Sequence, residues 1–282
     1  MGATETGASP DWLGVCRRSV AGLDQMLAEH PTTGERALET GRGEGGDEAV
    51  FIDRAAEDVI FAELQGLYDS GHRFLALSEE RGEVDFGDDA VRVIIDPIDG
   101  SHNAKRGLPH HAVSIAVAHG ETMADVLFGY VFDFGAREEW VARRDGGVSL
   151  NGTALAAPPP ERRTRDGRLE LVAVESANPR YLAAASEGLQ ARVHRVRALG
   201  TMAVSMCQVA ATRVDGMLSL WRCRAVDVAA AQLVVRESGG LVAFTDYADP
   251  LGAPLDLVPR SPVVAARTAA GLAELSLVSP SG

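Results

Sequence analysis

Cysteine is scarce in this chain. The 282 residues include three cysteines, Cys16, Cys207 and Cys223, which lie far apart and form no C-x-x-C pair. Their spacing argues against a zinc or redox site, and their odd number argues against a framework of disulfides. We therefore expect three buried free thiols.

Long apolar runs are absent as well. No stretch approaches the roughly 18 to 20 consecutive apolar residues that a membrane-spanning helix needs. The start of the chain also lacks the basic segment and apolar run of a secretion signal. The sequence therefore predicts a cytoplasmic protein that does not enter a membrane.

Basic residues are in deficit, with 27 Lys and Arg against 40 Asp and Glu, a net charge of −13. Nucleic-acid binding depends on basic surface, so we expect no nucleic-acid partner. An acidic chain suits the collection of divalent cations, although a solvated acidic surface accounts for most of this charge. The apolar content of 46% and the charged content of 24% are those of a folded globular protein.

The order of patterns along the chain predicts two coupled lobes. Residues 1–10 are expected to form a flexible tail, residues 11–155 an N-terminal α+β lobe with most metal ligands, and residues 156–282 a C-terminal α/β lobe. Helical spacing predicts helices at about 11–29 and 49–69, separated by a glycine-rich mobile loop. Short apolar runs then predict strands, and the turn dipeptide Asn151-Gly152 precedes a proline-containing boundary. The second half alternates strands and helices.

The most informative segment is Asp96-Pro97-Ile98-Asp99-Gly100-Ser101, which follows the apolar run Val93 to Ile95. Carboxylates at the end of a buried strand are costly unless a cation compensates them. Both aspartates and the Ile98 carbonyl can converge on a hard ion such as Mg²⁺. Backbone N–H groups of Gly100 and Ser101 can hold a phosphate. Taken alone, the segment is more often a simple turn.

Three further acidic residues lie where an oxygen-only metal site would need them. Glu79 follows an apolar run, Asp53 lies in the first turns of the second helix, and Asp227 opens a helix near residue 226. A helix N-terminus favours an acidic side chain or an anionic ligand. Each residue has an ordinary alternative, as a helix cap or a solvated charge. The coincidence of all three favours the metal site.

These segments resemble the inositol monophosphatase family of magnesium-dependent, lithium-sensitive sugar phosphatases. The resemblance is nearest to the archaeal-type branch that handles both inositol monophosphate and fructose 1,6-bisphosphate. It implies a layered αβαβα fold of the α+β or α/β class. The matching segments are Phe51–Glu57, Ser78–Glu80, Asp96–Ser101, Gly147–Gly152, Arg197–Gly200, Val214–Gly216, Val226–Ala230 and Glu237–Gly240.

The resemblance also implies roles for individual residues. Two or three Mg²⁺ ions would be held by Glu79, Asp96, Asp99, Asp227 and the Ile98 carbonyl. The residues with implied catalytic roles are Asp53, Glu79, Ser101 and Asp227. The implied substrate contacts are Asp99, Gly100, Ser101, Arg197, Arg222 and Arg224. Water would attack phosphorus in line, positioned by Asp53 and Ser101, and the glycine-rich loop would close over the site.

The chain departs from the family pattern at informative positions. Ser101 stands where members often carry Thr, which keeps the hydroxyl. The glutamate that many inositol-specific members carry after the late Asp-Gly is missing after Asp215-Gly216, so inositol specificity is not implied. Arg222, Arg224, Lys105 and Arg106 are candidates for binding a second phosphate or are solvated surface groups. Trp221 is expected to pack against the protein rather than to stack on a ligand.

The predicted function is hydrolysis of a small sugar or polyol phosphate, with a small-molecule ester as partner and a homodimer implied by the resemblance. Two alternatives stay open. A nucleotide 3′-phosphatase would use the same metal core with a pocket for adenine. A non-catalytic sugar-phosphate-binding protein would keep affinity without turnover, which the full set of acidic residues disfavours.

Overall fold

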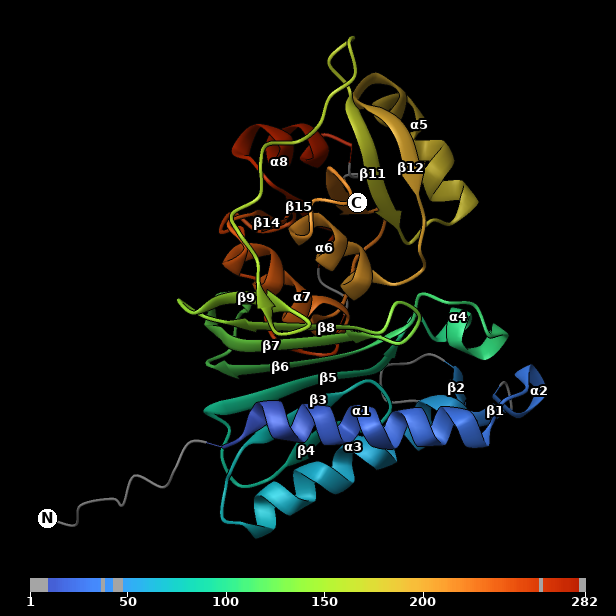
Figure 1. The fold of residues 1–282 in the computed structure, drawn as a ribbon, viewed down its shortest axis with the longest axis vertical. Helices are drawn as coiled ribbons and strands as arrows, with labels where there is room; N and C mark the ends of the chain where they lie inside the picture. The colour runs from blue at the N-terminus through green and yellow to red at the C-terminus, as the bar shows by residue number, and fades with distance from the viewer. Residues whose placement is uncertain (1–9, 37–38, 43–47, 259–260, 279–282) are drawn as a thin grey trace, which may run out of the picture.

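The computed structural model describes residues 10–36, 39–42, 48–258 and 261–278. Five layers are stacked along the long axis of the molecule, and Figure 1 shows them from the α1/α3 pair at the bottom to α5 and α8 at the top. This is a layered α+β arrangement in the order αβαβα, as the resemblance implied. No helix in the described part of the chain is long and apolar enough to cross a membrane.

The first layer is a helix pair, α1 (Trp12–Glu29) and α3 (Phe51–Asp69), packed on an eight-stranded sheet. The sheet order is β10-β9-β8-β7-β6-β5-β3-β4, and β3 with β5 is its parallel pair. Its strands are β3 (Leu75–Ser78), β4 (Gly82–Asp85), β5 (Val91–Asp99), β6 (Ala112–His119), β7 (Val126–Asp133), β8 (Glu138–Arg143), β9 (Gly147–Leu150) and β10 (Thr153–Ala154).

The middle layer is the helix pair α6 (Met202–Ala210) and α7 (Ala225–Glu237), which lies between the two sheets. The second sheet has the order β12-β11-β13-β15-β14, and α5 (Pro179–Arg192) and α8 (Ala269–Ser276) cover its outer face. Its strands are β11 (Leu169–Glu175), β12 (Val193–Arg197), β13 (Gly216–Ser219), β14 (Leu241–Phe244) and β15 (Val263–Ala266).

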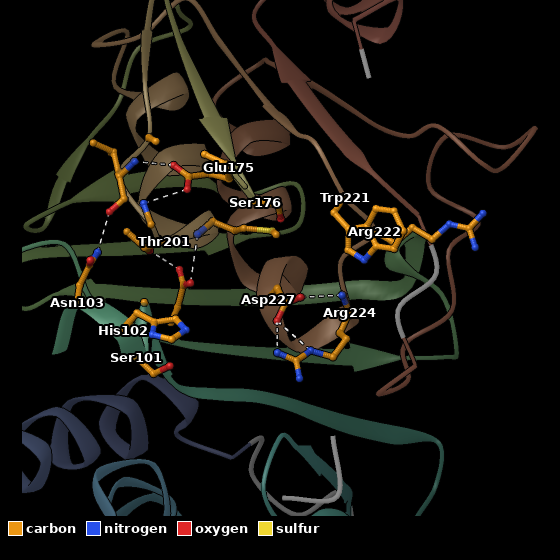
Figure 2. Close-up of a pocket in the computed structure, with 17 residues that line it drawn as sticks. Ser101, His102, Asn103, Glu175, Ser176, Thr201, Trp221, Arg222, Arg224 and Asp227 are labelled. Atoms are coloured by element: carbon orange, nitrogen blue, oxygen red, sulfur yellow. Dashed lines mark hydrogen bonds and ion pairs between the residues drawn. The ribbon is translucent and has the colours of Figure 1, made fainter. Parts of the chain in front are cut away.

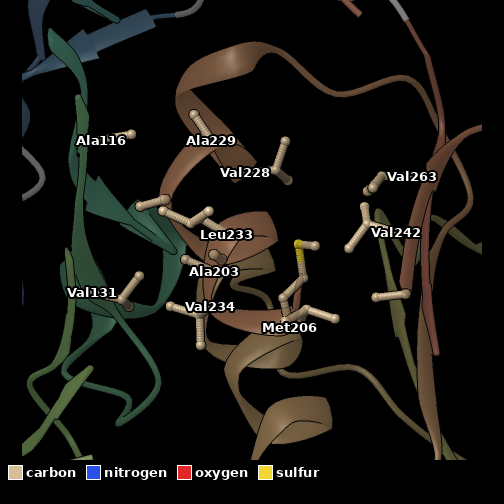
Figure 3. Packing of buried hydrophobic residues seen from close by; sticks show 14 of the residues in the cluster. Ala116, Val131, Ala203, Met206, Val228, Ala229, Leu233, Val234, Val242 and Val263 are labelled. Carbon is tan, nitrogen blue, oxygen red and sulfur yellow. The ribbon is translucent and has the colours of Figure 1, made fainter. Parts of the chain in front are cut away.

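The central strand β5 explains why the apolar run before Asp96 is continuous. Val93 and Ile95 contribute to the core under α1 and α3, whereas Ile94 faces the core of α6 and α7. A strand covered on both faces needs apolar residues at successive positions. Figure 3 shows the second of these cores, in which Leu233 and Val234 of α7 lie between Val131 of β7 and Met206 of α6.

The predicted helices and most predicted strands are confirmed, and so is the turn at Asn151-Gly152. Asn151 and Gly152 have φ of 50° and 76° and connect β9 to β10. The three cysteines are buried and free, as expected. The division into lobes at residue 155 stays a prediction.

Several expectations about local structure were wrong. The segment from 30 to 48 was expected to be a loop, but it contains α2 (Thr33–Arg36) and the strand β1 (Glu39–Arg42), which pairs with β2 (Glu48–Val50). The tip of the predicted loop, residues 43–47, lies outside the described residues. Strand β5 does not stop before Asp96 but continues to Asp99, with irregular pairing to β6 between these residues. The strands β4, β9, β10, β14 and β15 and the helix α8 were not predicted.

Close packing of α7 on β7 gives a first prediction. A Cβ atom at Gly129 would lie 2.6 Å from the carbonyl oxygen of Ala230, which belongs to the backbone of α7. Gly129→Ala should therefore push α7 off the sheet and lower the free energy of unfolding by about 1–3 kcal/mol, the usual cost of overpacking. Denaturant unfolding measures this change.

The matched control is Gly66→Ala in α3, where an added Cβ meets no atom within 4 Å. Alanine is favoured over glycine in a helix interior by up to about 1 kcal/mol, so this variant should be neutral or more stable. Equal stability of Gly129→Ala and the wild type would contradict the tight contact between α7 and β7.

Candidate functional site

A cavity of about 590 Å³ opens where several element ends meet. The end of β5, the start of α4 (Ser101–Arg106), the end of β11 and the starts of α6 and α7 surround it (Figure 2). The residues that line it are Asp99–Asn103, Glu175–Ala177, Ala198–Met202, Trp221, Arg222, Arg224 and Asp227. Segments far apart in the sequence therefore contribute to one site.

The carboxylates of Asp96 and Asp99 are buried at the end of β5, with 4% and 7% of each residue exposed. Burial raises the pKa of Asp96 well above its ordinary value, and the nearby carboxylates of Asp99, Glu79 and Asp227 raise it further. Burial also raises the pKa of Asp99 to about 7. These carboxylates therefore need a cation to stay ionised.

Asp99 is fixed by the N-terminus of α6. The hydroxyl of Thr201 donates a hydrogen bond to its carboxylate, and the backbone N–H of Ala203 donates another at 2.7 Å. Thr201 is also the N-cap of α6, where its hydroxyl accepts from the N–H of Val204. Asp99 is thus held by a part of the chain about 100 residues away.

Arg224 supplies the cation in this structure. Its Nη1 lies 2.8 Å from Glu79 Oε1, and its Nη2 lies 3.2 Å from Asp227 Oδ1. Burial alone would lower the pKa of Arg224, but the carboxylates of Asp227 and Glu79 outweigh it and raise the pKa above its ordinary value. Asp227 also accepts the backbone N–H of Arg224 at 2.7 Å, which closes the first turn of α7.

The donor chemistry of this cluster fits a hard divalent cation. Within the described ranges, no group of three or more His, Cys, Asp or Glu side chains is gathered closely enough to hold a metal ion. Yet the carboxylates of Glu79, Asp96 and Asp227 all act on Arg224, whose single charge is smaller than theirs combined. Oxygen-only donors with an excess of negative charge favour Mg²⁺ or a similar ion. The assignment of individual metal ligands, including the Ile98 carbonyl, stays a prediction.

Gly100 begins α4 in a backbone conformation that requires glycine. Its φ is +85°, and a Cβ there would lie 2.8 Å from the His110 carbonyl oxygen and 3.0 Å from the Gly200 carbonyl oxygen. Glycine therefore permits the close approach of three segments beside Ser101. Asn103 strengthens this junction, because its side-chain amide donates to the carbonyls of His110 and Leu199.

Asp53 lies in the first turn of α3 and pairs with a lysine of α4. The Nζ atom of Lys105 is 3.4 Å from Asp53 Oδ2, and both side chains are mostly buried. Lys105 is therefore not a solvated surface group, which was one of its predicted alternatives. Glu80 is a further acidic residue here that the prediction missed. Burial raises its pKa to about 7, helped by the charges of Asp53 and Glu57.

Glu175 is a second residue that the sequence analysis missed. It ends β11, is 2% exposed and accepts hydrogen bonds from the N–H groups of Leu199 and Gly200 and from the hydroxyl of Ser205. Burial raises its pKa. It therefore positions the loop that leads to Thr201. An isolated glutamate at the end of an apolar strand was the available signal.

The arginines that were predicted to contact substrate differ in their position relative to the cavity. Arg222 lines the cavity, and its Nε lies 3.1 Å from Asp246 Oδ2. Arg197 is exposed at the end of β12 and is not among the residues that line the cavity, while its Nη1 donates to the carbonyl of Val196. Arg106 extends back along α4 toward His102. A substrate contact by Arg197 stays a prediction.

Trp221 was expected to pack against the protein. The structure shows this packing, but it also shows that Trp221 is exposed in the cavity. Its ring stacks in parallel on Tyr181, with the ring centroids 4.8 Å apart. However, 49% of the residue is exposed, and it lines the cavity.

Comparison with known proteins identifies relatives along most of the chain. Residues 17–278 match the description of the inositol monophosphatase family. A fructose-1,6-bisphosphatase/inositol-1-monophosphatase of Thermococcus kodakarensis is 30% identical over 82% of this chain and 83% of its own length. An inositol-1-monophosphatase of Mesorhizobium japonicum is 36% identical over 71% and 73%. The solved structure of the extragenic suppressor protein suhB from Bartonella henselae superposes with a TM-score of 0.75, at 26% identity, over 96% of this chain and 98% of that one.

The position of Arg224 gives a second prediction. Arg224→Met removes the guanidinium from Glu79, Asp96 and Asp227, so the metal-free protein should lose about 3–5 kcal/mol of stability, as when one partner of a buried ion pair is removed. Added Mg²⁺ should then stabilise this variant more than the wild type, because the Arg224 guanidinium no longer competes for the carboxylates. Thermal unfolding with chelator and with Mg²⁺ measures both effects.

Arg222→Met is the matched control, because the Arg222 side chain is 47% exposed and pairs with Asp246 at the rim. An exposed ion pair is worth about 0–1 kcal/mol, so this variant should behave like the wild type in both conditions. If Arg224→Met and Arg222→Met were equally stable in chelator, Arg224 would not be the counter-ion of the acidic cluster.

Proposed function

Because the chain belongs to the inositol monophosphatase family, we propose that it is a magnesium-dependent phosphomonoesterase that hydrolyses the phosphate ester of a small sugar or polyol. The observation that carries this proposal is the acidic cluster beside the cavity, in which Asp96 and Asp99 are buried and Glu79 and Asp227 are mostly buried. Carboxylates that together carry more charge than the Arg224 guanidinium beside them are suited to binding divalent cations. An open cavity next to them gives a substrate access.

Glu79, Asp96, Asp99, Asp227 and the Ile98 carbonyl would hold two or three Mg²⁺ ions, an assignment supported by the family resemblance. When bound, Mg²⁺ lowers the pKa of water and neutralises charge on the phosphoryl and leaving oxygens. The carboxylates are suited to this role because each comes from a rigid position. Asp96 and Asp99 end a central strand, and Asp227 lies in the first turn of α7.

The remaining residues would bind and orient the reactants. Backbone N–H groups of Gly100 and Ser101 would hold the phosphate at the start of α4. Asp53 and the Ser101 hydroxyl would position the attacking water for in-line displacement at phosphorus, and Lys105 fixes the Asp53 carboxylate from 3.4 Å. Asp227 would pass a proton toward the leaving alcohol. No covalent phosphoenzyme is needed.

The substrate is proposed from the relatives together with the cavity. The names of the relatives point to inositol monophosphate and fructose 1,6-bisphosphate. A volume of about 590 Å³ accommodates a molecule of this size. Arg222 at the rim supports binding of a second phosphate or a hydroxyl group. Arg224 would be available to substrate only after leaving Glu79, and Arg197 would contact it only from outside the cavity lining.

A homodimer and a cytoplasmic location are also proposed. The family resemblance supports the homodimer. The expectation of a cytoplasmic protein comes from the sequence. Size-exclusion chromatography with light scattering tests the first, and fractionation of cells tests the second.

Asp96→Asn gives a third prediction. The substitution keeps the size of the side chain but removes the charge, so Mg²⁺-dependent phosphate release should fall by at least roughly 10²–10³-fold. The fold should survive, because the charged form of Asp96 is disfavoured by burial and by its neighbours. Phosphate release and thermal unfolding in chelator measure the two effects.

Asp89→Asn, at an exposed position before β5, is the control and should keep full activity. Wild-type activity in Asp96→Asn would remove Asp96 from the metal site. Loss of activity together with loss of the folding transition would make the variant uninformative about metal, so Asp96→Glu serves as a second test: it keeps the charge and displaces it, and it should also lose activity.

A substrate panel tests the function itself. Phosphate release is measured from inositol 1-phosphate, fructose 1,6-bisphosphate, fructose 6-phosphate and adenosine 3′,5′-bisphosphate, each with Mg²⁺ and with chelator. We expect chelator-sensitive release from an inositol or fructose ester. Preference for the adenosine ester would favour the nucleotide 3′-phosphatase, and no release from any ester would favour a binding protein.

A further inference from the structure

One wall of the cavity carries an aromatic residue, Trp221, that the metal chemistry does not use. Trp221 stacks on Tyr181 with the ring planes parallel and the centroids 4.8 Å apart. Only one face of the indole can be covered by Tyr181, and 49% of Trp221 remains exposed. A large aromatic side chain that is exposed inside a cavity has unused apolar surface.

The Trp221 backbone is held from both sides. The hydroxyl of Ser219 donates to the Trp221 carbonyl at 2.8 Å and accepts the N–H of Val263. On the other side, the N–H of Cys223 donates to the carbonyl of Ser261. The neighbouring Leu220 is fully buried. The indole is therefore presented by a fixed strand end, which lowers the entropy lost when a ligand stacks on it.

The cavity has two ends of different chemistry. Asp99, Ser101 and Asp227 form the charged end, and Figure 2 shows Ser101 and Trp221 on opposite sides of the opening. The lining also includes the apolar residue Ala177, which follows Ser176 in the chain. If phosphate is held at the charged end, the alcohol part of the ester extends toward the indole.

Ser176 adds an independent sign of function at this end. It lines the cavity beside Trp221 and adopts a φ of 55°, in the left-handed region that non-glycine residues rarely use. Such backbone strain persists only where the surroundings impose it, and it is concentrated at functional sites. Ser176 and Arg222 are polar residues that line the same cavity as the exposed indole, and the Nε atom of Arg222 lies 3.1 Å from Asp246 Oδ2.

We propose that Trp221 determines specificity for the leaving alcohol, selecting esters of ring alcohols that lay a flat face of C–H bonds on the indole and direct hydroxyl groups to Ser176 and Arg222. This inference rests on the proposed phosphatase function. Tyr181 acts as a positioning residue, because it contacts Trp221 and does not line the cavity. Esters of acyclic alcohols gain no binding energy from the exposed face of the Trp221 indole.

The test compares a ring ester with an acyclic ester. Trp221→Ala should lower kcat/KM for inositol 1-phosphate about tenfold, through KM, and should leave kcat/KM for glycerol 2-phosphate within about twofold of the wild type. Trp221→Phe should restore most of the preference for the ring, because a phenyl face also stacks. Tyr181→Ala should give a smaller loss in the same direction, and Tyr181→Phe should recover it.

Tyr68→Ala is the matched control. Tyr68 is an exposed aromatic residue that packs on Phe86, with 5.7 Å between the ring centroids, and it does not line the cavity. Tyr68→Ala should leave kcat/KM unchanged for both inositol 1-phosphate and glycerol 2-phosphate. Equal losses on both esters in Trp221→Ala, or no loss on either, would overturn the proposal.

A binding measurement separates this inference from the proposed function. If the wild type releases no phosphate from either ester, the phosphatase proposal fails, and indole fluorescence is then titrated with inositol 1-phosphate in the presence of Mg²⁺. A saturable change of fluorescence that Trp221→Phe abolishes supports stacking of the ring alcohol on Trp221. No saturable change, or a change that persists in Trp221→Phe, overturns it. A stronger response to adenosine 3′,5′-bisphosphate than to inositol 1-phosphate would also overturn it, in favour of an aromatic base.

Discussion

The free-energy cost of burying negative charge at the end of β5 is the main constraint on the structure around the site. Asp96 and Asp99 lie almost out of contact with water, where neighbouring carboxylates raise the pKa of Asp96 further. Such a cluster is tolerated only with a cation close by. Arg224 provides one from the N-cap position of α7. Within the described residues, the Arg224 guanidinium therefore offsets part of the carboxylates' charge, and a divalent ion would offset more of it.

The five-layer architecture is what brings these charges together. Strand β5 is covered on both faces, so it delivers its terminal aspartates into the interior rather than to a surface. Helix α7 packs on the first sheet so closely that Gly129 leaves no space for a side chain, and this contact fixes Asp227. Glu175 and Thr201 then tie the second sheet and α6 to Asp99. The two sheets and the helix layer between them thus each contribute a restraint to the same cluster.

Periodicity and strand-end carboxylates were enough to predict the main helices, most strands and two of the acidic residues that line the cavity, Asp99 and Asp227, but not Glu175. Short edge elements such as β4 and β14 lacked a clear pattern. The continuation of β5 to Asp99 could not be predicted from the sequence, because aspartate and proline normally indicate that a strand has ended. The sign of a charge does not reveal its partner, so Arg224 was predicted either to bind a second phosphate or to be a solvated surface group. The pairing of Trp221 with Tyr181 depends on tertiary structure alone.

The internal counter-ion also bears on the order of events in the life of the protein. Many small metal-binding domains cannot fold before their metal arrives, because the ligands repel one another until it does. Here Arg224 and Asp227 are three residues apart at the start of α7, so the chain itself supplies a cation beside a carboxylate that is proposed to bind metal. If Asp227 binds Mg²⁺ as proposed, folding would not have to wait for the metal. The newly made protein would complete its core first and bind free Mg²⁺ afterwards.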